Sequence, residues 1–292
     1  MKRFLARLLL AIGVASAFVV LGYVVLLISS KRLNKLDDNR VIYVWGDSQM
    51  FTGLNERLLG NLINRKVMTA ADHGSGVYDL MANMANVPIG STCVVSFPEG
   101  SFLRNPLTDN NRTGFELGCL LDLYRAGCPL DECMKIANLN KGMIKYKAFR
   151  YGHCLFPYSE VLSYPEPLAL WRSMFEEDRP WLSWKTKAYS MAIQHLQEKR
   201  CQIVMVCFPF EASVEAMAKE TANRQMMDSL KLGLVEKYAM KQDTIVLSND
   251  SLLMHDLSHL NEVGARRFTH RIADILQVDT VNNRFVEVII GQ

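Results

Sequence analysis

A chain of 292 residues, of which 49% are hydrophobic, is long enough for one sizeable α/β domain and a small appendage, and its composition excludes a disordered or fibrous protein. The segment before Leu36 contains six basic residues and no acidic residue, so the positive formal charge of +3 comes from this N-terminal segment. The remainder holds 27 basic and 30 acidic residues, which leaves no basic stripe for nucleic acid, and we predict no nucleic-acid partner.

The first predicted element is an uncharged apolar segment. Leu8 to Ile28 has 21 residues, the length of a helix that crosses the hydrocarbon core of a bilayer, about 30 Å. A cleaved signal peptide is the alternative, because residues 15–17 read Ala-Ser-Ala, but the apolar run continues well beyond them. We expect residues 1–30 to be an uncleaved membrane anchor and residues 31–40 to be a linker.

Charge alone leaves the orientation of this anchor open, since three basic residues precede the span and three follow it. The very short N-terminal head favours a cytoplasmic N-terminus. The domain after the linker is then extracytoplasmic, in the periplasm or at the cell surface. The sequence thus predicts a single-pass membrane protein that contacts the lipid bilayer through residues 8–28.

Seven cysteines are an odd number, and none of them stands in a C-x-x-C pair. We therefore predict no metal site. Three cysteines lie in apolar runs and are predicted to be small core residues: Cys93, Cys201 and Cys207. In an extracytoplasmic domain the other four could supply one or two disulfides, in a connectivity that the sequence does not select: Cys119, Cys128, Cys133 and Cys154.

Five apolar segments of strand length follow the linker and alternate with segments of helical periodicity. The predicted strands are Val41–Trp45, Lys66–Ala70, Thr92–Phe97, Gln202–Phe208 and Thr244–Leu247. The predicted helices are Leu54–Asn64, Val77–Ala85, Lys185–Arg200, Val214–Met240 and Glu262–Leu276. Continuous apolar strands that alternate with helices predict a mainly parallel, five-stranded sheet with helices on both faces, in one α/β domain over residues 41–292.

The third and fourth predicted strands are separated by over one hundred residues, far more than a crossover helix requires. Residues from about 101 to 184 are therefore predicted to be an insertion. Their aromatic and proline residues favour irregular cover over the site. The last apolar stretch, Arg284–Ile290, is predicted to be an extra edge strand without an assigned partner.

Gly46-Asp47-Ser48 directly follows the first predicted strand, at the edge where open parallel sheets bind their ligands. Gly46 relieves the backbone at the turn, and Ser48 at the head of the next helix is expected close to amide donors that favour developing negative charge. The competing interpretation is that Ser48 only caps this helix, as serines at such turns often do.

A partner for Ser48 stands near the end of the chain, where Asp256 precedes His259 by three residues after the fifth predicted strand. A serine hydroxyl needs a base to remove its proton, and an imidazole needs an acceptor on its second nitrogen to act as that base. Ser48, His259 and Asp256 are therefore the predicted nucleophile, base and orienting acid. His255 is the rival base, and the alternative for Asp256 and His259 together is that they only cap a helix.

These residues resemble two sequence blocks of the SGNH/GDSL hydrolases. Gly46-Asp47-Ser48 is similar to the first block and Asp256-x-x-His259 to the last, and the similarity extends through His259-Leu260-Asn261-Glu262-x-Gly264-Ala265. The resemblance implies a three-layer, flavodoxin-like α/β/α sandwich. It also implies cleavage or transfer of O-acyl groups through a Ser-His-Asp triad without a cofactor.

In this family a glycine of the second block donates its amide to the oxyanion hole, and the matching place here is Asp72-His73-Gly74-Ser75-Gly76. The resemblance assigns the oxyanion hole to the amides of Ser48 and Gly76, with Gly74 as the fallback. An ordinary glycine turn is the alternative. Ser75 is a rival nucleophile without a partner at a suitable spacing.

The chain departs from the family at the third block. Gly-x-Asn-Asp is replaced by Ser96-Phe97-Pro98-Glu99-Gly100-Ser101, so the asparagine donor of the oxyanion hole is missing. Glu99 is an acceptor at neutral pH and cannot replace that amide. Either a backbone amide, Ser101 or Asn105 substitutes, or the activity is weak or absent.

This departure and the N-terminal anchor are more similar to the membrane-anchored acyl-transfer branch, such as the D-alanyl transfer proteins of teichoic-acid modification. The likeness leaves room for a membrane-bound acyl-donor protein as a partner. We expect a membrane-anchored serine esterase or O-acyltransferase that acts on acyl esters of an envelope glycan, lipid or polymer. The alternative is an inactive domain of this fold that scaffolds envelope assembly or binds a glycan. A nucleotide-binding domain is disfavoured, because no G-x-x-x-x-G-K loop follows a strand.

Overall fold

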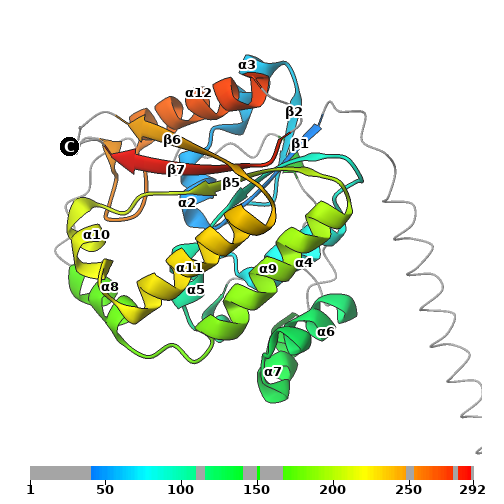
Figure 1. Ribbon diagram of the computed structural model, residues 1–292, viewed down its shortest axis with the longest axis vertical. Coiled ribbons are helices and arrows are strands. Elements are labelled where there is room, and N and C mark those ends of the chain that lie inside the picture. The colour runs from blue at the N-terminus through cyan, green and yellow to red at the C-terminus, as the bar shows by residue number, and fades with distance from the viewer. Residues whose placement is uncertain are drawn as a thin grey trace, which may run out of the picture.

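A computed structural model describes residues 41–109, 116–140, 150–151, 167–247, 253–278 and 282–290. In these ranges the chain forms one sheet with helices on both faces, in the order β4-β2-β1-β3-β5-β7-β6 (Figure 1). The predicted anchor, residues 8–28, lies outside the described residues. Within the described ranges, no helix combines the length and the apolarity needed to cross a bilayer.

The sheet contains six mutually parallel strands: β1 (Val41–Trp45), β2 (Lys66–Thr69), β3 (Thr92–Ser96), β5 (Gln202–Cys207), β6 (Lys241–Leu247) and β7 (Arg284–Ile290). The two-residue strand β4 (Arg150–Tyr151) pairs antiparallel with β2 at one edge. The predicted α/β architecture with a mainly parallel sheet is therefore confirmed and fits a flavodoxin-like fold, whereas the predicted number of five strands is wrong.

The additional parallel strand is β7, which was predicted to be an edge strand. It lies between β5 and β6 and pairs in parallel with both. The side chains of Phe285, Val286 and Val288 are buried, as expected for a strand that is covered on both faces. β6 occupies the edge instead, because the order of strands in a parallel sheet depends on long-range packing that the order along the chain does not encode.

The helices, in chain order, are α2 (Ser48–Gly53), α3 (Glu56–Ile63), α4 (Val77–Ala85), α5 (Glu99–Leu103), α6 (Leu117–Ala126), α7 (Leu130–Asn140), α8 (Pro167–Glu176), α9 (Leu182–Glu198), α10 (Ala212–Ala218), α11 (Ala222–Lys237) and α12 (Glu262–Val278), with a 3-10 turn η1 (Pro106–Thr108). The single helix predicted over Val214–Met240 is divided, because Thr221 caps α11 by accepting the amide of Arg224. The described part of the predicted insertion is mostly helical rather than irregular, since it contains α6, α7 and α8.

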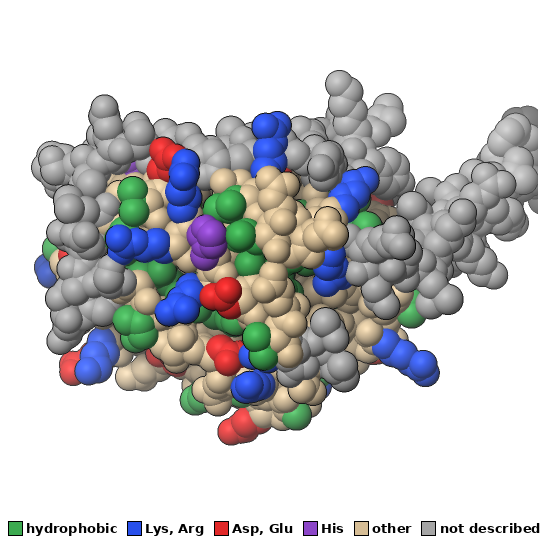
Figure 2. All heavy atoms as spheres, turned by 90° about the horizontal axis from the view of Figure 1, so that it is seen from above, with side chains coloured by type: hydrophobic (Ala, Val, Ile, Leu, Met, Phe, Trp, Pro, Cys, Tyr) green, Lys and Arg blue, Asp and Glu red, His purple; other side chains and the backbone are tan. Residues whose placement is uncertain are grey.

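Adjacent residues of each strand point to opposite faces of the sheet and enter two cores. Val44 and Val94 pack with α2, α3 and α12 on one face. Trp45 and Val95 pack with α4, α9 and α11 on the other, and α6 packs on α4 and α9. The outer surface of α3 and α12 has mixed charge, because its Lys and Arg side chains are interspersed with acidic and apolar ones (Figure 2).

Six of the seven cysteines fall in the described residues, and all six are buried free thiols. The predicted core positions of Cys93, Cys201 and Cys207 are confirmed. Among the residues that the structure describes, the remaining cysteines form no disulfide with one another: Cys119, Cys128 and Cys133. Cys154, the fourth predicted bridge candidate, lies outside these ranges.

Candidate active site

Ser48 is the first residue of α2, directly after the turn that follows β1. This turn requires Gly46, since a Cβ there would lie 2.1 Å from the Cβ of Met50. Asp47 is the N-cap of α2, and its Oδ1 accepts a hydrogen bond from the amide of Gln49 at 3.2 Å. The interpretation of Ser48 as a helix cap is therefore wrong, because its neighbour takes that role and leaves the Ser48 hydroxyl for another contact.

Ser48, His259 and Asp256 lie in one chain of hydrogen bonds. The Oγ of Ser48 lies 2.8 Å from Nε2 of His259, although the two residues are 211 positions apart. The Nδ1 of His259 lies 2.7 Å from Oδ2 of Asp256. With a neutral ring, Nδ1–H donates to Asp256 and Nε2 accepts the hydroxyl, which is the arrangement that a general base needs. His255 is linked to this loop through its amide, which donates to the His259 carbonyl at 2.7 Å.

Asp256 orients both the ring and the loop of His259. Its Oδ1 accepts hydrogen bonds from the amides of Ser258 and His259, each at 2.8 Å. Burial raises the pKa of Asp256, but the hydrogen bond and charge of His259 and the two amides outweigh burial and hold this pKa at about 2. Asp256 is therefore a carboxylate at neutral pH, as a partner of an imidazolium must be.

The residues after His259 have a clear local role. The Oδ1 of Asn261 accepts the amide of Gly264 at 3.0 Å in the first turn of α12. A Cβ at Gly264 would lie 2.5 Å from the carbonyl oxygen of Leu253, so only glycine lets the start of the loop approach the helix. This part of the sequence therefore packs the start of the loop against α12, and the amide of Asn261 donates to the carbonyl of Leu253 at 2.9 Å two residues after His259.

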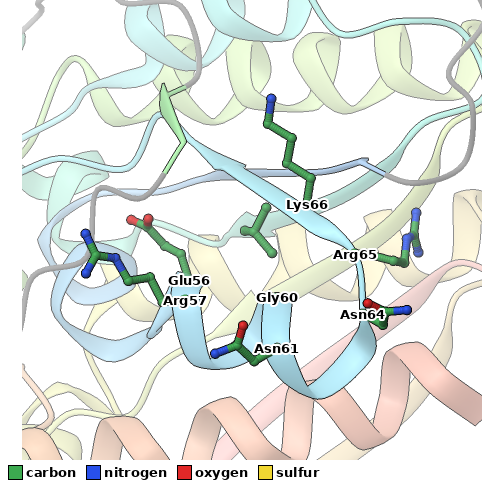
Figure 3. Close-up of a pocket in the computed structure, with 8 residues that line it drawn as sticks. Glu56, Arg57, Gly60, Asn61, Asn64, Arg65 and Lys66 are labelled. Atoms are coloured by element: carbon green, nitrogen blue, oxygen red, sulfur yellow. The ribbon is translucent and has the colours of Figure 1, made fainter.

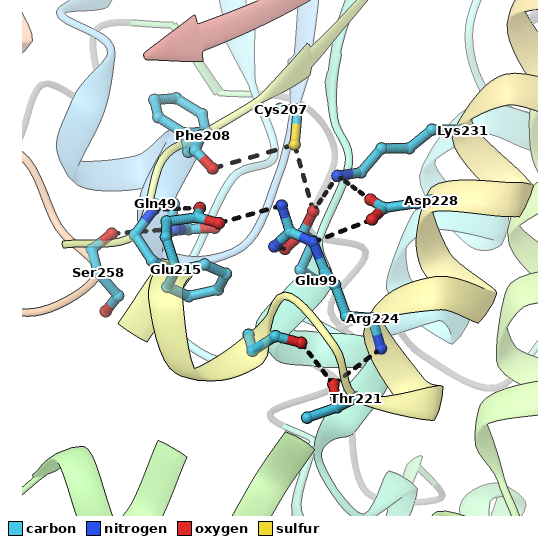
Figure 4. A network of polar contacts seen from close by, with 12 residues as sticks. Gln49, Glu99, Cys207, Phe208, Glu215, Thr221, Arg224, Asp228, Lys231 and Ser258 are labelled. Atoms are coloured by element: carbon cyan, nitrogen blue, oxygen red, sulfur yellow. Dashed lines mark hydrogen bonds and ion pairs between the residues drawn. The ribbon is translucent and has the colours of Figure 1, made fainter. Parts of the chain in front are cut away.

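Gln49 was not singled out by the sequence, yet it joins the two halves of the site. Its side chain is buried, and its Nε2 donates to the carbonyl of Ser258 at 2.9 Å (Figure 4). This bond ties α2, which carries Ser48, to the loop that carries His259. The position of Gln49 directly after Ser48 is the signal that could have indicated this role.

The glycines that were assigned to the oxyanion hole lie in the loop after β2. Gly76 is the N-cap of α4, and Gly74 has a left-handed φ of 71°. This loop is tied to the one after β1 by the amide of Asp72, which donates to the carbonyl of Gly46 at 3.1 Å. Within the described ranges, no residue accepts a hydrogen bond from the amide of Ser48 or of Gly76, so neither donor is already used there.

The third-block region has a different use in this chain. Glu99 is 1% exposed and forms ion pairs with Arg224, at 2.8 Å, and with Lys231. Asp228 contacts the same two cations, which lie between its carboxylate and that of Glu99 (Figure 4). Glu99 is thus an acceptor, as its residue type indicates, and it stabilises the packing of α11 on the sheet. The sequence did not reveal these cations, which lie more than one hundred residues away.

Two side chains were expected as substitutes for the missing asparagine. Asn105 is exposed and caps η1, where its Oδ1 accepts the amide of Leu107 at 3.0 Å. The Oγ of Ser101 is buried and has no hydrogen-bond partner within the described part of the chain. Asn105 is therefore engaged elsewhere, and Ser101 keeps an unused hydroxyl in the interior.

A cleft of about 690 Å³ lies at the carboxyl ends of β5 and β7, next to the loop of His259. Its lining includes Phe208, Phe210 and Met254 together with the acidic Glu215. The cation Arg224 also lines it, but each of its nitrogens faces a carboxylate, so it has little capacity left for an anionic ligand.

A second cleft, of about 640 Å³, lies between α3 and the start of β2. Glu56 and Arg57 lie side by side at one end of it and Arg65 at the other (Figure 3). Burial raises the pKa of Glu56 to about 8 in spite of the charge of Arg57, and Oε2 of Glu56 has no partner in the described ranges. The sequence did not indicate this buried carboxyl group.

Among the described residues, no group of three or more His, Cys, Asp or Glu side chains is arranged to hold a metal ion. No model of a known protein family matches the chain, and no curated protein matches it either. The resemblance to the SGNH/GDSL hydrolases therefore stays a prediction from the residues.

Proposed function

We propose that this chain is a serine esterase or O-acyltransferase of the SGNH/GDSL type that acts on acyl esters of an envelope glycan, lipid or polymer. Residues 8–28 anchor it in a membrane, with the domain on the extracytoplasmic side. The observation that carries the proposal is the continuous contact from Ser48 Oγ through the ring of His259 to Asp256. A serine that only stabilised the fold would need no such aligned base and acid.

The proposed first half-reaction forms an acyl-enzyme. The Oγ of Ser48 attacks the carbonyl carbon of the ester while Nε2 of His259 takes its proton, and Asp256 stabilises the imidazolium. The amides of Ser48 and Gly76 stabilise the oxyanion of the tetrahedral intermediate. When this intermediate collapses, His259 gives the proton to the leaving alcohol oxygen, and the acyl group remains on Ser48.

The second half-reaction uses the same groups in reverse. Water, or a hydroxyl group of an acceptor, gives its proton to His259 and attacks the acyl carbonyl carbon. Collapse of the second intermediate returns the proton to Ser48 and releases an acid or a new ester. Hydrolysis and transfer thus differ only in the molecule that reaches His259, and the site needs no cofactor for either.

The replacement at the third block favours a second candidate, an inactive scaffold or glycan-binding domain. Loss of one oxyanion donor typically lowers kcat by about 10² to 10³-fold. This loss slows a triad enzyme without abolishing its activity. The alignment of His259 and Asp256 therefore favours the enzyme over the inactive domain.

The test is turnover of short p-nitrophenyl esters by the purified full-length protein in detergent. We expect hydrolysis that is lost in Ser48→Ala and retained in the matched variant Ser229→Ala, which removes an exposed hydroxyl on α11. Equal turnover in Ser48→Ala would remove this serine from its role. A folded wild-type protein without any turnover would support the inactive domain instead.

A further inference from the structure

Lys185 is a charged residue in the interior of the protein, on the second turn of α9. Its side chain is 1% exposed. Its Nζ donates to the carbonyls of Ser101 at 2.7 Å and Arg104 at 2.8 Å, and to Oδ2 of Asp109 at 2.8 Å. An ammonium group has three donors, so these three acceptors use all of them. One buried group thus holds the end of α5 and the end of η1 together.

Asp109 carries this contact to the loop of the oxyanion hole. Its carboxylate is 3% exposed and lies directly against Gly76. A Cβ at Gly76 would be 2.4 Å from Oδ2, 2.6 Å from Cγ and 2.8 Å from Cβ of Asp109. The last of these atoms is fixed to the backbone and cannot move aside, so glycine is required for the two segments to meet. Lys185 therefore contacts Asp109, and Asp109 in turn contacts Gly76.

We propose that Lys185 and Asp109 are positioning residues that hold the Gly76 amide where it stabilises the oxyanion. This inference rests on the proposed function, because the oxyanion exists only if Ser48 attacks an ester. The pair would hold the loop of Gly76 in place in a chain that lacks the third-block asparagine. The support comes from α9, outside the sequence blocks that resemble the family.

The charges of the pair suit a place beside an oxyanion. A lone carboxylate against Gly76 would repel the developing negative charge, but Lys185 compensates it at 2.8 Å. Burial raises the pKa of Asp109 and lowers that of Lys185, and the charge of each partner opposes the shift of the other. With both partners charged, the net charge of the pair is zero.

The experiment compares Asp109→Ala with Asp109→Asn in the full-length protein, with a short p-nitrophenyl ester as the probe. We expect Asp109→Ala to lower kcat by about 10 to 100-fold, because an oxyanion donor displaced by about 1 Å loses most of its effect. KM should change by less than about threefold, since the contact acts in the transition state. Asp109→Asn keeps the shape and an acceptor for Lys185, so it should retain kcat within about threefold.

The matched control is Asp243→Ala, which breaks another largely buried ion pair, with Arg284, near the amino end of β6. We expect it to lower the melting temperature without changing kcat. The positioning role is overturned if Asp109→Ala loses stability like the control and keeps its kcat. Should Asp109→Ala fail to fold, Asp109→Ser gives the same comparison with a small polar group facing Lys185. A wild-type protein without turnover would contradict the proposed function, and the positioning role with it.

Discussion

The loops that follow β1 and β3 leave the same edge of the sheet from neighbouring strands, yet they use their polar residues in opposite ways. After β1, Ser48 is partly exposed, and its hydroxyl contacts the ring of His259. After β3, Glu99 is buried between Arg224 and Lys231. A place at the carboxyl edge therefore does not make a polar residue reactive. The partners of the side chain decide whether it is available for chemistry or fixed in the scaffold.

The largest expected effect on activity comes from removing His259, the base that follows β6 and contacts Ser48. His259→Gln should lower kcat for a short ester by at least about 10⁴-fold, since the Ser48 hydroxyl then has no group to take its proton. Circular dichroism should show an unchanged fold. His255→Gln, which removes the rival base, should lower kcat by less than about tenfold. A larger loss in His255→Gln than in His259→Gln would reverse the assignment.

Removal of the charge behind His259 should have the next largest effect. Asp256→Asn should lower kcat by about 10³ to 10⁴-fold, because asparagine holds the ring in the wrong tautomer and cannot stabilise the imidazolium.

The same variant has a pH signature in its stability. The pKa of Asp256 is lowered from 3.8 to about 2, so its contribution is complete above pH 3.8 and is lost as the pH falls through 2. Denaturant unfolding should therefore show a stability difference between wild type and Asp256→Asn that is largest at neutral pH and smaller at pH 3. An equal difference at both pH values would contradict an ionised Asp256 in the folded protein.

The structural role of Glu99 after β3 is tested by the variant Glu99→Gln. Loss of this charge leaves Arg224 and Lys231 without their buried partner, so the free energy of unfolding should fall by about 3–5 kcal/mol. The kcat of the folded fraction should stay within about threefold. The matched control is Glu262→Gln, which breaks an exposed pair with Arg266 and should change stability by less than about 1 kcal/mol. A large loss of kcat with full stability would instead place Glu99 in the active site.

Glu56 differs from Glu99, because it is a buried carboxyl group with no ion pair among the described residues. Burial raises its pKa from 4.5 to about 8, so its contribution to stability is complete below pH 4.5 and is lost as the pH rises through 8. Glu56→Gln should therefore gain about 1–3 kcal/mol over wild type at pH 9 relative to pH 6. Urea unfolding at both pH values measures this gain, and a pH-independent difference would show that the carboxyl group is solvated.

Much of the fold and of the site was predictable, because both depend on local patterns. Apolar runs predicted the first three strands, and the spacing of Asp256 and His259 predicted a pair that now lies against Ser48. The interior place of β7 was not predictable in this way. Its pairing with β5 and β6 depends on which strand buries its apolar side chains best, and no short segment contains that information.

The interior charges were missed for a related reason. Lys185 lies on the same buried face of α9 as Leu182, Tyr189 and Leu196, so helical periodicity could have marked it as a core-facing lysine. Its acceptors, however, come from α5 and from the residue that follows η1, far away in the chain. Periodicity can therefore show that a charge is buried, but only the fold shows what compensates it.

The most direct test of the central claim is to identify the residue that reacts with a fluorophosphonate. The full-length protein in detergent is incubated with the reagent, digested, and its modified peptide is sequenced by mass spectrometry. We predict that the Ser48 Oγ displaces fluoride and bears the only phosphonyl group, and that His259→Gln suppresses this adduct. An adduct on another residue, or none at all on a folded protein that still hydrolyses esters, would contradict the assignment of Ser48 as the nucleophile.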